Sequence, residues 1–349
     1  MIQSASGLPP ARTPHAVRGI LLSGLVALAG CGGGGGSSSS GGGSVPLPPP
    51  PPPPSSPPVA GQLSLVTGFG TNAGSLNMYV YVPVGLTANR PLVVILPGCG
   101  GHAADYDTET GWAKWADQMQ FSLVIPEVTA VQPNGCFRWY DPAHQARGSG
   151  EPATIIEMID WMKSHYSVDA TRVFVTGFSG GGGETNVMLA TYPDVFAAGA
   201  PMAGFPYKCA VGAAEVSGCQ FGALSKTPTQ WGDLVRSGYP GYHGPWPRVS
   251  VWTGTADTSV IPANAQETMT EWTDVNGEDQ TPEISETVAG YPHKVYGASK
   301  VETYEITGMG HAIPIKPGTG PEDCGSGGPT ANTDICGSLY IARWFGLDH

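Results

Sequence analysis

The sequence predicts an α/β domain with a mostly parallel central sheet that helices cover on both faces. Two patterns in residues 59–349 carry this prediction. Short apolar runs bounded by glycine or proline alternate with longer segments in which apolar residues recur at helical spacing. Most of the short runs are apolar throughout, as is typical of strands that are buried on both faces of a parallel sheet.

The predicted strands are spaced widely enough to leave room for helices between them. Residues 76–82 alternate apolar and polar side chains, which predicts an antiparallel strand at the edge of the sheet. The predicted buried strands are residues 91–96, 121–125, 172–176, 196–202 and 248–253, and residues 300–306 form a further strand-like run.

Two segments between these strands have a helical stripe of apolar side chains. The stripes consist of Trp112, Trp115, Ala116 and Met119 and of Ile155, Ile156, Ile159 and Met162. We interpret both as parts of the core, because a stripe at this spacing usually packs a helix against its neighbours. A last helix-like run covers residues 339–345.

The composition is that of a folded domain with an acidic surface. Of 349 residues, 40% are hydrophobic and 13% charged, and 28 acidic residues outnumber 16 basic ones. Such a surface repels nucleic acid and anionic lipid, so we expect neither as a partner and favour an uncharged substrate. The glycines at 180–183 lack the lysine that a phosphate-binding loop would need.

The N-terminal segment has the layout of an export signal. Arg12 and Arg18 precede an apolar run at residues 20–29, which is too short to span a bilayer. Residues 28–31, Leu-Ala-Gly-Cys, resemble a bacterial lipobox, which predicts a signal peptide over residues 1–30 and a lipid on Cys31. The alternative is an ordinary secretory signal followed by an unrelated cysteine.

A tether is predicted to follow the lipidated cysteine. Of residues 32–58, 25 of 27 are Gly, Ser or Pro, and such a segment cannot form a core. We therefore expect residues 31–58 to link a lipid anchor to one catalytic domain at residues 59–349. The domain is expected to be a monomer at the cell surface, anchored in a bacterial outer membrane, with its lipid as the only membrane contact.

The six remaining cysteines predict disulfide bonds. They are Cys99, Cys136, Cys209, Cys219, Cys324 and Cys336, an even number in an exported chain, with no C-x-x-C pair that would indicate zinc. Six cysteines allow 15 connectivities. Short separations favour pairing the third with the fourth and the fifth with the sixth, which leaves the first for the second.

A serine in a glycine-rich turn is the predicted nucleophile. Residues 172–176 run directly into Gly-Phe-Ser-Gly-Gly at 177–181, and a helical segment follows. This strand, turn and helix form the setting of a G-x-S-x-G nucleophile elbow, whose glycines let the backbone adopt a strained turn. Ser179 is therefore the candidate nucleophile.

A serine hydroxyl needs a histidine base, which in this arrangement follows the serine and an acid along the chain. His311 is the favoured base, because it lies in a glycine-rich loop just after the strand-like residues 300–306. His293 lies in a polar stretch and His349 is the last residue, so both are less suitable. The alternative is that His311 has only a structural role and caps a helix.

The favoured acid is Asp257. It follows the predicted strand at residues 248–253 after a turn of small residues. Asp194 lies too close to the nucleophile helix, and Asp274 and Asp279 lie in a polar segment. Asp257 could alternatively serve only to form a turn.

An oxyanion hole needs two backbone N–H donors. Gly180 after the nucleophile would supply one, and Cys99 in the glycine-rich loop after the strand at 91–96 would supply the other. A bond from Cys99 to Cys136 would fasten this loop to residues 136–140. We therefore predict that Arg138, Trp139 and Tyr140 contact the substrate.

Eight runs of this sequence resemble the extracellular polyhydroxybutyrate depolymerases, whose relatives include feruloyl and acetyl xylan esterases. They are residues 76–84, 91–105, 148–150, 170–179, 188–200, 204–209, 245–257 and 308–311, and the segments 189–196 and 244–252 are the most specific. The resemblance covers nearly all of residues 62–349. It implies an α/β-hydrolase fold with Ser179, Asp257 and His311 as the triad and the Cys99 amide in the oxyanion hole.

The sequence departs from this family at three places. Pro97 stands where the family usually has His, Arg138 where it has Asn, and Gly182, Gly183 and Glu184 replace the usual small residues after the nucleophile. The first two changes bear on specificity more than on the reaction. Because the chain ends soon after residues 339–345, we do not expect the C-terminal substrate-binding domain that many polymer depolymerases carry.

Together these features predict a secreted serine ester hydrolase that cleaves polyhydroxybutyrate-type polyesters and their oligomers through an acyl-enzyme, without a metal or cofactor. One alternative is a feruloyl or acetyl xylan esterase acting on plant polysaccharide. Another is a non-catalytic binding lipoprotein on a hydrolase scaffold, against which the complete set of Ser179, Asp257 and His311 argues.

Overall fold

A computed structural model of the chain describes residues 57–222 and 225–349. The predicted signal peptide, Cys31 and nearly all of the predicted tether lie outside the described residues. Within the described part, no helix is both long enough and apolar enough to cross a membrane.

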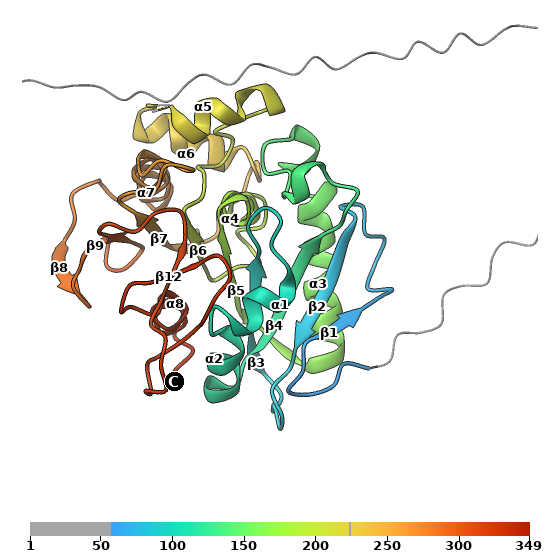
Figure 1. Cartoon of the computed structure of the whole chain (residues 1–349). Coiled ribbons are helices and arrows are strands. Elements are labelled where there is room, and N and C mark those ends of the chain that lie inside the picture. Colours follow the sequence, from blue (N-terminus) through green and yellow to red (C-terminus); the bar gives the residue numbers. More distant parts are fainter. Residues whose placement is uncertain (1–56, 223–224) are drawn as a thin grey trace, which may run out of the picture. The chain divides into compact units, whose positions relative to one another are not determined.

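The core of the fold is a ten-stranded sheet in the order β1-β2-β4-β3-β5-β6-β7-β10-β9-β8 (Figure 1). The strands from β4 to β10 in this order are parallel to one another, and every pairing outside this stretch is antiparallel. The strands are β1 Ser64–Val66, β2 Leu76–Tyr81, β3 Arg90–Leu96, β4 Ser122–Val128, β5 Val168–Phe178, β6 Ala198–Met202, β7 Arg248–Gly254, β8 Ile284–Val288, β9 Tyr291–Tyr296 and β10 Val301–Ile306. The predicted mostly parallel sheet is therefore confirmed.

Helices cover both faces of this sheet, which separates two hydrophobic cores. One core contains side chains of α3, α4, α6 and α7, and the other contains side chains of α1, α2 and α8. The helices are α1 Ala103–Thr108, α2 Trp112–Met119, α3 Gly150–Tyr166, α4 Gly180–Thr191, α5 Val216–Phe221, α6 Pro228–Arg236, α7 Ala263–Asn276 and α8 Gly337–Trp344. Strand β3 contributes side chains to both cores. Val94 lies in the first and Val93 in the second, because successive side chains of a strand point to opposite faces of the sheet.

Both helical stripes of the sequence lie in these cores. Trp112 and Trp115 of α2 are buried in the second core, and Ile155 and Ile159 of α3 are buried in the first. Their interpretation as core residues is therefore confirmed.

Both edges of the sheet differ from the sequence-based prediction. Strand β2, predicted to be an edge strand, pairs with β1 on one side and with β4 on the other, so the short strand β1 forms that edge. Strands β8 and β9 form a hairpin through Ala289 and Gly290, both at positive φ, which extends the sheet beyond β10. The polar stretch around His293 is thus a strand, with that side chain bonded to Glu286 and Glu302. The hairpin has no apolar signal because β8 is almost wholly exposed.

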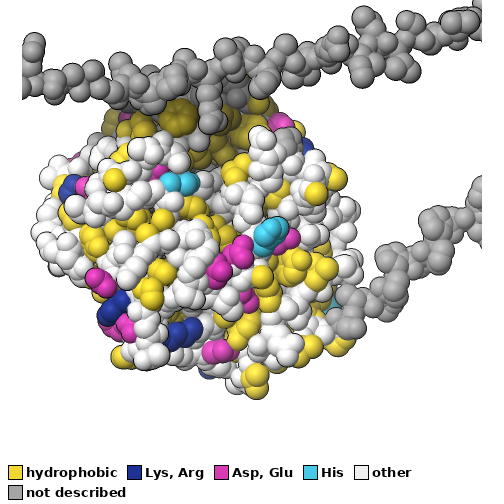
Figure 2. Space-filling view, in the orientation of Figure 1, with side chains coloured by type: hydrophobic (Ala, Val, Ile, Leu, Met, Phe, Trp, Pro, Cys, Tyr) yellow, Lys and Arg dark blue, Asp and Glu magenta, His cyan; other side chains and the backbone are white. Residues whose placement is uncertain are grey.

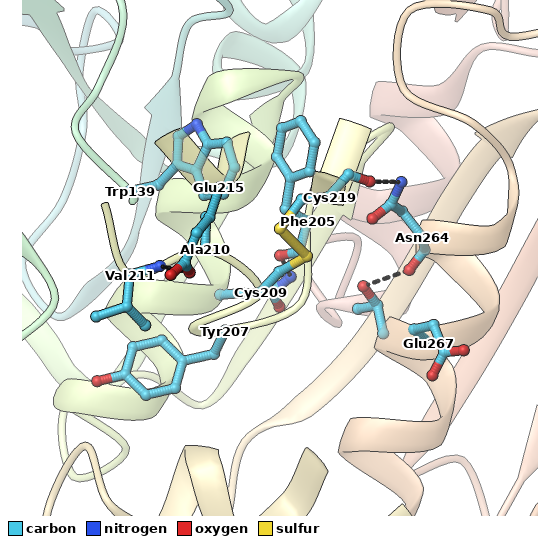
Figure 3. The surroundings of a disulfide bond; sticks show 12 residues. Trp139, Phe205, Tyr207, Cys209, Ala210, Val211, Glu215, Cys219, Asn264 and Glu267 are labelled. Carbon is cyan, nitrogen blue, oxygen red and sulfur yellow. Dashed lines mark hydrogen bonds between the residues drawn. A yellow bond between two sulfur atoms is a disulfide. The ribbon is translucent and has the colours of Figure 1, made fainter. Parts of the chain in front are cut away.

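Three disulfides fasten loops of the described domain. They join Cys99 to Cys136, Cys209 to Cys219 and Cys324 to Cys336, the three pairs that the sequence separations favour. Figure 3 shows the Cys209–Cys219 bond, which lies beside Phe205 on one side and near Asn264 of α7 on the other. A smaller parallel pair, β11 Ile313–Ile315 and β12 Thr330–Asn332, lies near the third disulfide.

Candidate active site

Ser179 lies in a strained turn between β5 and α4. Its backbone has φ 57° and ψ −119°, a combination that residues other than glycine rarely adopt. A Cβ at Gly177 would collide with the carbonyl of Gly181, and a Cβ at Gly181 would collide with the carbonyl of Leu96. Both glycines of the motif are therefore required for the backbone to pass this closely, which is the geometry of a nucleophile elbow.

The structure brings Ser179, His311 and Asp257 into one hydrogen-bonded chain. His311 Nε2 lies 2.8 Å from Ser179 Oγ, and His311 Nδ1 lies 2.7 Å from Asp257 Oδ2. The other carboxylate oxygen of Asp257 accepts bonds from the amides of Ser259 and Val260 at 2.8 and 2.9 Å. Because its side chain is wholly buried and doubly bonded, Asp257 can hold the imidazole in one orientation.

The topology of the sheet explains why these residues meet. Ser179, Asp257 and His311 follow the carboxyl ends of β5, β7 and β10, which run parallel in one half of the sheet. The loops after β7 and β10 also bind each other, since the amide of Ala256 donates to Met309 and that of Gly308 donates to Thr255.

The amides of Cys99 and Gly180 lie close to each other beside the nucleophile. A Cβ on Gly180 would lie 2.9 Å from Cys99 Sγ and 3.9 Å from Cys99 N. Gly180 begins α4, where helix amides have no intrahelical acceptor, and the Cys99 amide donates to no acceptor in the described part of the chain. Both N–H groups are thus available to an oxyanion.

The Cys99–Cys136 disulfide connects this loop to the residues beyond it. A backbone bond of 2.8 Å from the amide of Gly100 to Gly135 runs beside the disulfide, so two links hold the loop. They place Trp139 and Tyr140 in the wall of a pocket of about 320 Å³ that includes Ser179 and Gly180.

A second cavity of about 510 Å³ also borders Ser179. It is lined by His311, Phe178, Tyr106 and the glycine-rich loop that contains Cys99, together with Pro329 and neighbouring residues. Ser179 and Cys99 line both cavities, so the candidate nucleophile borders each of them.

Arg138 does not line either cavity. Its guanidinium lies 3.2 Å from His144 Nε2, and its amide donates to Glu151 Oε2 at 2.7 Å. Of the three predicted substrate contacts, the structure thus brings Trp139 and Tyr140 to the pocket and keeps Arg138 behind it, because buried polar partners bind both its backbone and its side chain.

Several residues of this region were missed by sequence reasoning. Phe205 stacks on Trp139 with ring centroids 4.0 Å apart, and Ala213, Val216 and Gln220 complete the pocket wall. The only signal that could have pointed to them is the close pair of cysteines at 209 and 219, which marks a constrained segment.

Two buried carboxyl groups near the nucleophile helix were also missed. Burial raises the pKa of Glu184 well above its usual range, and the charge of Glu151 adds to this rise. Burial likewise raises the pKa of Glu271, against a lowering effect of the amide of Tyr207, which donates to it at 2.9 Å. Both groups therefore favour their protonated form, and neither contacts the pocket. Among the described residues, no cluster of three acidic, histidine or cysteine side chains could hold a metal ion.

Comparison with known proteins gives the family. Residues 76–284 match the family described as esterase PHB depolymerase. The chain is 47% identical over 291 residues to poly(3-hydroxyalkanoate) depolymerase C of Paucimonas lemoignei, which covers 82% of this chain and 70% of the relative. It is 36% identical over 265 residues to feruloyl esterase B of Talaromyces funiculosus, covering 73% of this chain and 74% of the relative.

A solved structure agrees with this result. The acetyl xylan esterase from Aspergillus awamori matches with a TM-score of 0.71 and 30% identity, covering 82% of this chain and 99% of that structure. The family predicted from the sequence motifs is confirmed, and so is the fold. The chain belongs to the esterase PHB depolymerase family and is a carboxylic ester hydrolase with an α/β-hydrolase fold.

Proposed function

We propose that this protein is a serine hydrolase that cleaves polyhydroxybutyrate-type aliphatic polyesters and their oligomers, with Ser179, His311 and Asp257 as its catalytic triad. The observation that carries the proposal is the pair of hydrogen bonds, 2.8 and 2.7 Å, that His311 makes to Ser179 and Asp257. The depolymerase named above is also more similar to this chain than the feruloyl esterase, at 47% against 36% identity.

The reaction follows from these positions. Ser179 Oγ attacks the ester carbonyl carbon while His311 Nε2 takes its proton, and Asp257 stabilises the imidazolium. The carbonyl oxygen becomes an oxyanion that accepts hydrogen bonds from the amides of Cys99 and Gly180. Collapse of this intermediate breaks the ester bond, and His311 returns the proton to the departing alkoxide. Water, activated by His311, then releases the acid from Ser179.

The substrate is proposed to be uncharged because the protein is acidic. The net charge is −12, and on the face in Figure 2 Lys and Arg side chains are scattered and form no continuous patch. An acidic polymer would be repelled by such a surface, whereas a polyester would not.

The protein is proposed to act at the cell surface. Its three disulfides fit an oxidising compartment outside the cytoplasm. We retain the division into a signal peptide at residues 1–30, a lipidated Cys31 with a tether to residue 58, and a catalytic domain from residue 59. The lipid would anchor the domain in a bacterial outer membrane.

A feruloyl or acetyl xylan esterase is the second candidate. The stacked rings of Trp139 and Phe205 in the pocket wall could receive a planar aromatic acyl group as well as an aliphatic one. The related feruloyl esterase B covers 73% of this chain at 36% identity, and this similarity supports the second candidate.

The triad is tested with Ser179→Ala and a matched control, Ser285→Ala, an exposed serine on the edge strand β8. Ser179→Ala should lose at least about a thousandfold in kcat on p-nitrophenyl butyrate and should no longer react with a serine-directed phosphonate. The control should match the wild type in both measurements. Retention of more than about a tenth of the activity by Ser179→Ala would exclude Ser179 as the nucleophile.

The substrate is tested by comparing rates on four esters. We expect hydroxybutyrate trimer and amorphous polyhydroxybutyrate to be cleaved faster than methyl ferulate and acetylated xylan. If either of the last two is cleaved as fast as the trimer, the second candidate replaces the first.

A further inference from the structure

The two cavities beside Ser179 differ in the catalytic groups that line them. We call the first the aromatic pocket; its walls include Trp139, Tyr140, Phe205, Val216 and Gln220. The second, which we call the histidine cavity, includes His311 and Phe178. Gly180 lines only the aromatic pocket and His311 lines only the histidine cavity, so the cavities are not equivalent for a bound ester.

The position of the general acid decides which part of the ester occupies which cavity. When the tetrahedral intermediate collapses, His311 must donate its proton to the alkoxide that leaves. The alcohol portion therefore has to lie on the side of His311, in the histidine cavity. The acyl portion, which remains bonded to Ser179, is left with the aromatic pocket, which Ser179 also lines and His311 does not.

We propose that the aromatic pocket binds the acyl portion of the substrate and that Val216 determines the length of acyl group it accepts. This inference rests on the proposed triad but not on the identity of the natural polymer.

The wall that contains Val216 is one face of a short helical segment. Ala213, Val216 and Gln220 line the pocket, and their spacing of three and four residues places them on one side of successive helical turns. These turns are the 3₁₀ helix Ala213–Glu215 and α5. Val216 is the middle member and has the larger of the two aliphatic side chains, and it is half-buried and packed against the first core.

This wall is held firmly, so the size of its side chains sets the size of the pocket. The Cys209–Cys219 disulfide closes the segment at its base, and both sulfurs belong to buried residues. The carbonyl of Cys219 accepts a bond of 2.9 Å from Asn264 Nδ2 on α7, and the amide of Val211 donates to Glu215 at 2.8 Å (Figure 3).

The opposite wall is equally fixed. Trp139 stacks on Phe205, with the ring planes 8° apart, and Gln145 Nε2 donates to the carbonyl of Trp139. Because the disulfide and hydrogen bonds fasten one wall and ring stacking holds the other, a change in side-chain size at Val216 should change the acyl groups that fit.

The test measures kcat/KM of the full domain on p-nitrophenyl acetate, butyrate, hexanoate and octanoate. Val216→Phe should lower kcat/KM on butyrate and hexanoate by about tenfold or more while acetate stays within about threefold of the wild type. Val216→Ala should shift the preferred acyl chain toward hexanoate or octanoate. The matched control is Val211→Ala, because Val211 belongs to the same segment but is 47% exposed and lies outside the pocket wall.

A second arm keeps the acyl group constant. Acetate esters of methyl, butyl and benzyl alcohol should keep the same relative rates in wild type and both Val216 variants, since the alcohol occupies the other cavity. An unchanged acyl profile in the folded Val216→Ala protein, or a change in the alcohol series instead, would overturn the assignment.

The outcomes separate this inference from the proposed function. If the wild type cleaves none of these esters, both the proposed triad and the proposed acyl pocket are wrong. If it cleaves them with the expected dependence on Val216 but does not attack hydroxybutyrate oligomers, only the proposed polymer is wrong. If it cleaves the oligomers but the dependence of kcat/KM on acyl length is the same in the wild type and the Val216 variants, only the acyl pocket is wrong.

Discussion

Replacing Glu184 by glutamine should make the protein more stable than the wild type, by an amount that grows with pH. Glu184 is completely buried in α4, and neither of its carboxyl oxygens has a hydrogen-bond partner among the described residues. Burial raises the pKa of this carboxyl well above its usual range, and Glu151 raises it further. The folded protein therefore keeps a proton on Glu184 that the unfolded chain releases.

The size of the effect follows from this one proton. Above the ordinary glutamate pKa, the native state binds one more proton than the unfolded state, so the free energy of unfolding falls as pH rises. For each pH unit the unfolding equilibrium constant rises tenfold, which lowers the free energy of unfolding by about 1.4 kcal/mol, until the buried carboxyl itself titrates. Glutamine has nearly the shape of the protonated acid but no proton to lose, so Glu184→Gln removes this penalty.

The assay is urea unfolding of wild type and variant at pH 5, 6, 7 and 8 with the disulfides intact. The gap in unfolding free energy should widen in favour of Glu184→Gln by up to about 1.4 kcal/mol per pH unit. Glu283→Gln, at an exposed glutamate, serves as the control and should show no such trend. A gap that stays constant from pH 5 to 8, or that widens in favour of the wild type, would refute the reasoning.

Three further predictions concern other parts of the chain. Cys136→Ser breaks the bond to Cys99 and should lower kcat on p-nitrophenyl butyrate more than it raises KM, because the proposed oxyanion-hole amide of Cys99 loses its fixed position. Equal changes in kcat and KM would contradict this. Arg147→Lys loses the bidentate ion pair with Asp194. Since both side chains are about one-third exposed, we expect the free energy of unfolding to fall by only about 1 kcal/mol, measured by thermal unfolding. An unchanged Tm would show that the pair contributes nothing. In a bacterial host, palmitate should label the wild type but not Cys31→Ala, and unlabelled wild type would rule out the lipid.

The geometry of the proposed triad could be anticipated from the sequence because it depends on backbone features that leave local signals. A nucleophile elbow requires glycines at 177 and 181 whatever the rest of the protein does. Asp257 and His311 each follow a predicted strand, and parallel strands end at the same edge of their sheet. Chain order and strand ends were therefore enough to choose them over His293 and the other candidates.

The pocket wall beyond Trp139 and Tyr140 could not be anticipated in the same way, because it comes from segments that meet them only in the folded protein. Phe205 lies after β6 and Val216 in α5, and neither position has a pattern that distinguishes it from core or loop. The β8–β9 hairpin was missed for a related reason, since an exposed edge strand has no apolar alternation.

Arg138 shows why a charged residue next to an aromatic wall is a poor guide to substrate contact. Its amide donates to the buried carboxylate of Glu151 and its guanidinium contacts His144, and the residue lines neither cavity. The next residue, Trp139, has its carbonyl held by Gln145 and its ring held against Phe205. Polar contacts behind the wall and stacking within it thus act on the same short stretch of chain. An effect of Arg138 on specificity would follow from where it holds Trp139 and not from its charge meeting the ester, which is consistent with a pocket suited to an uncharged acyl group.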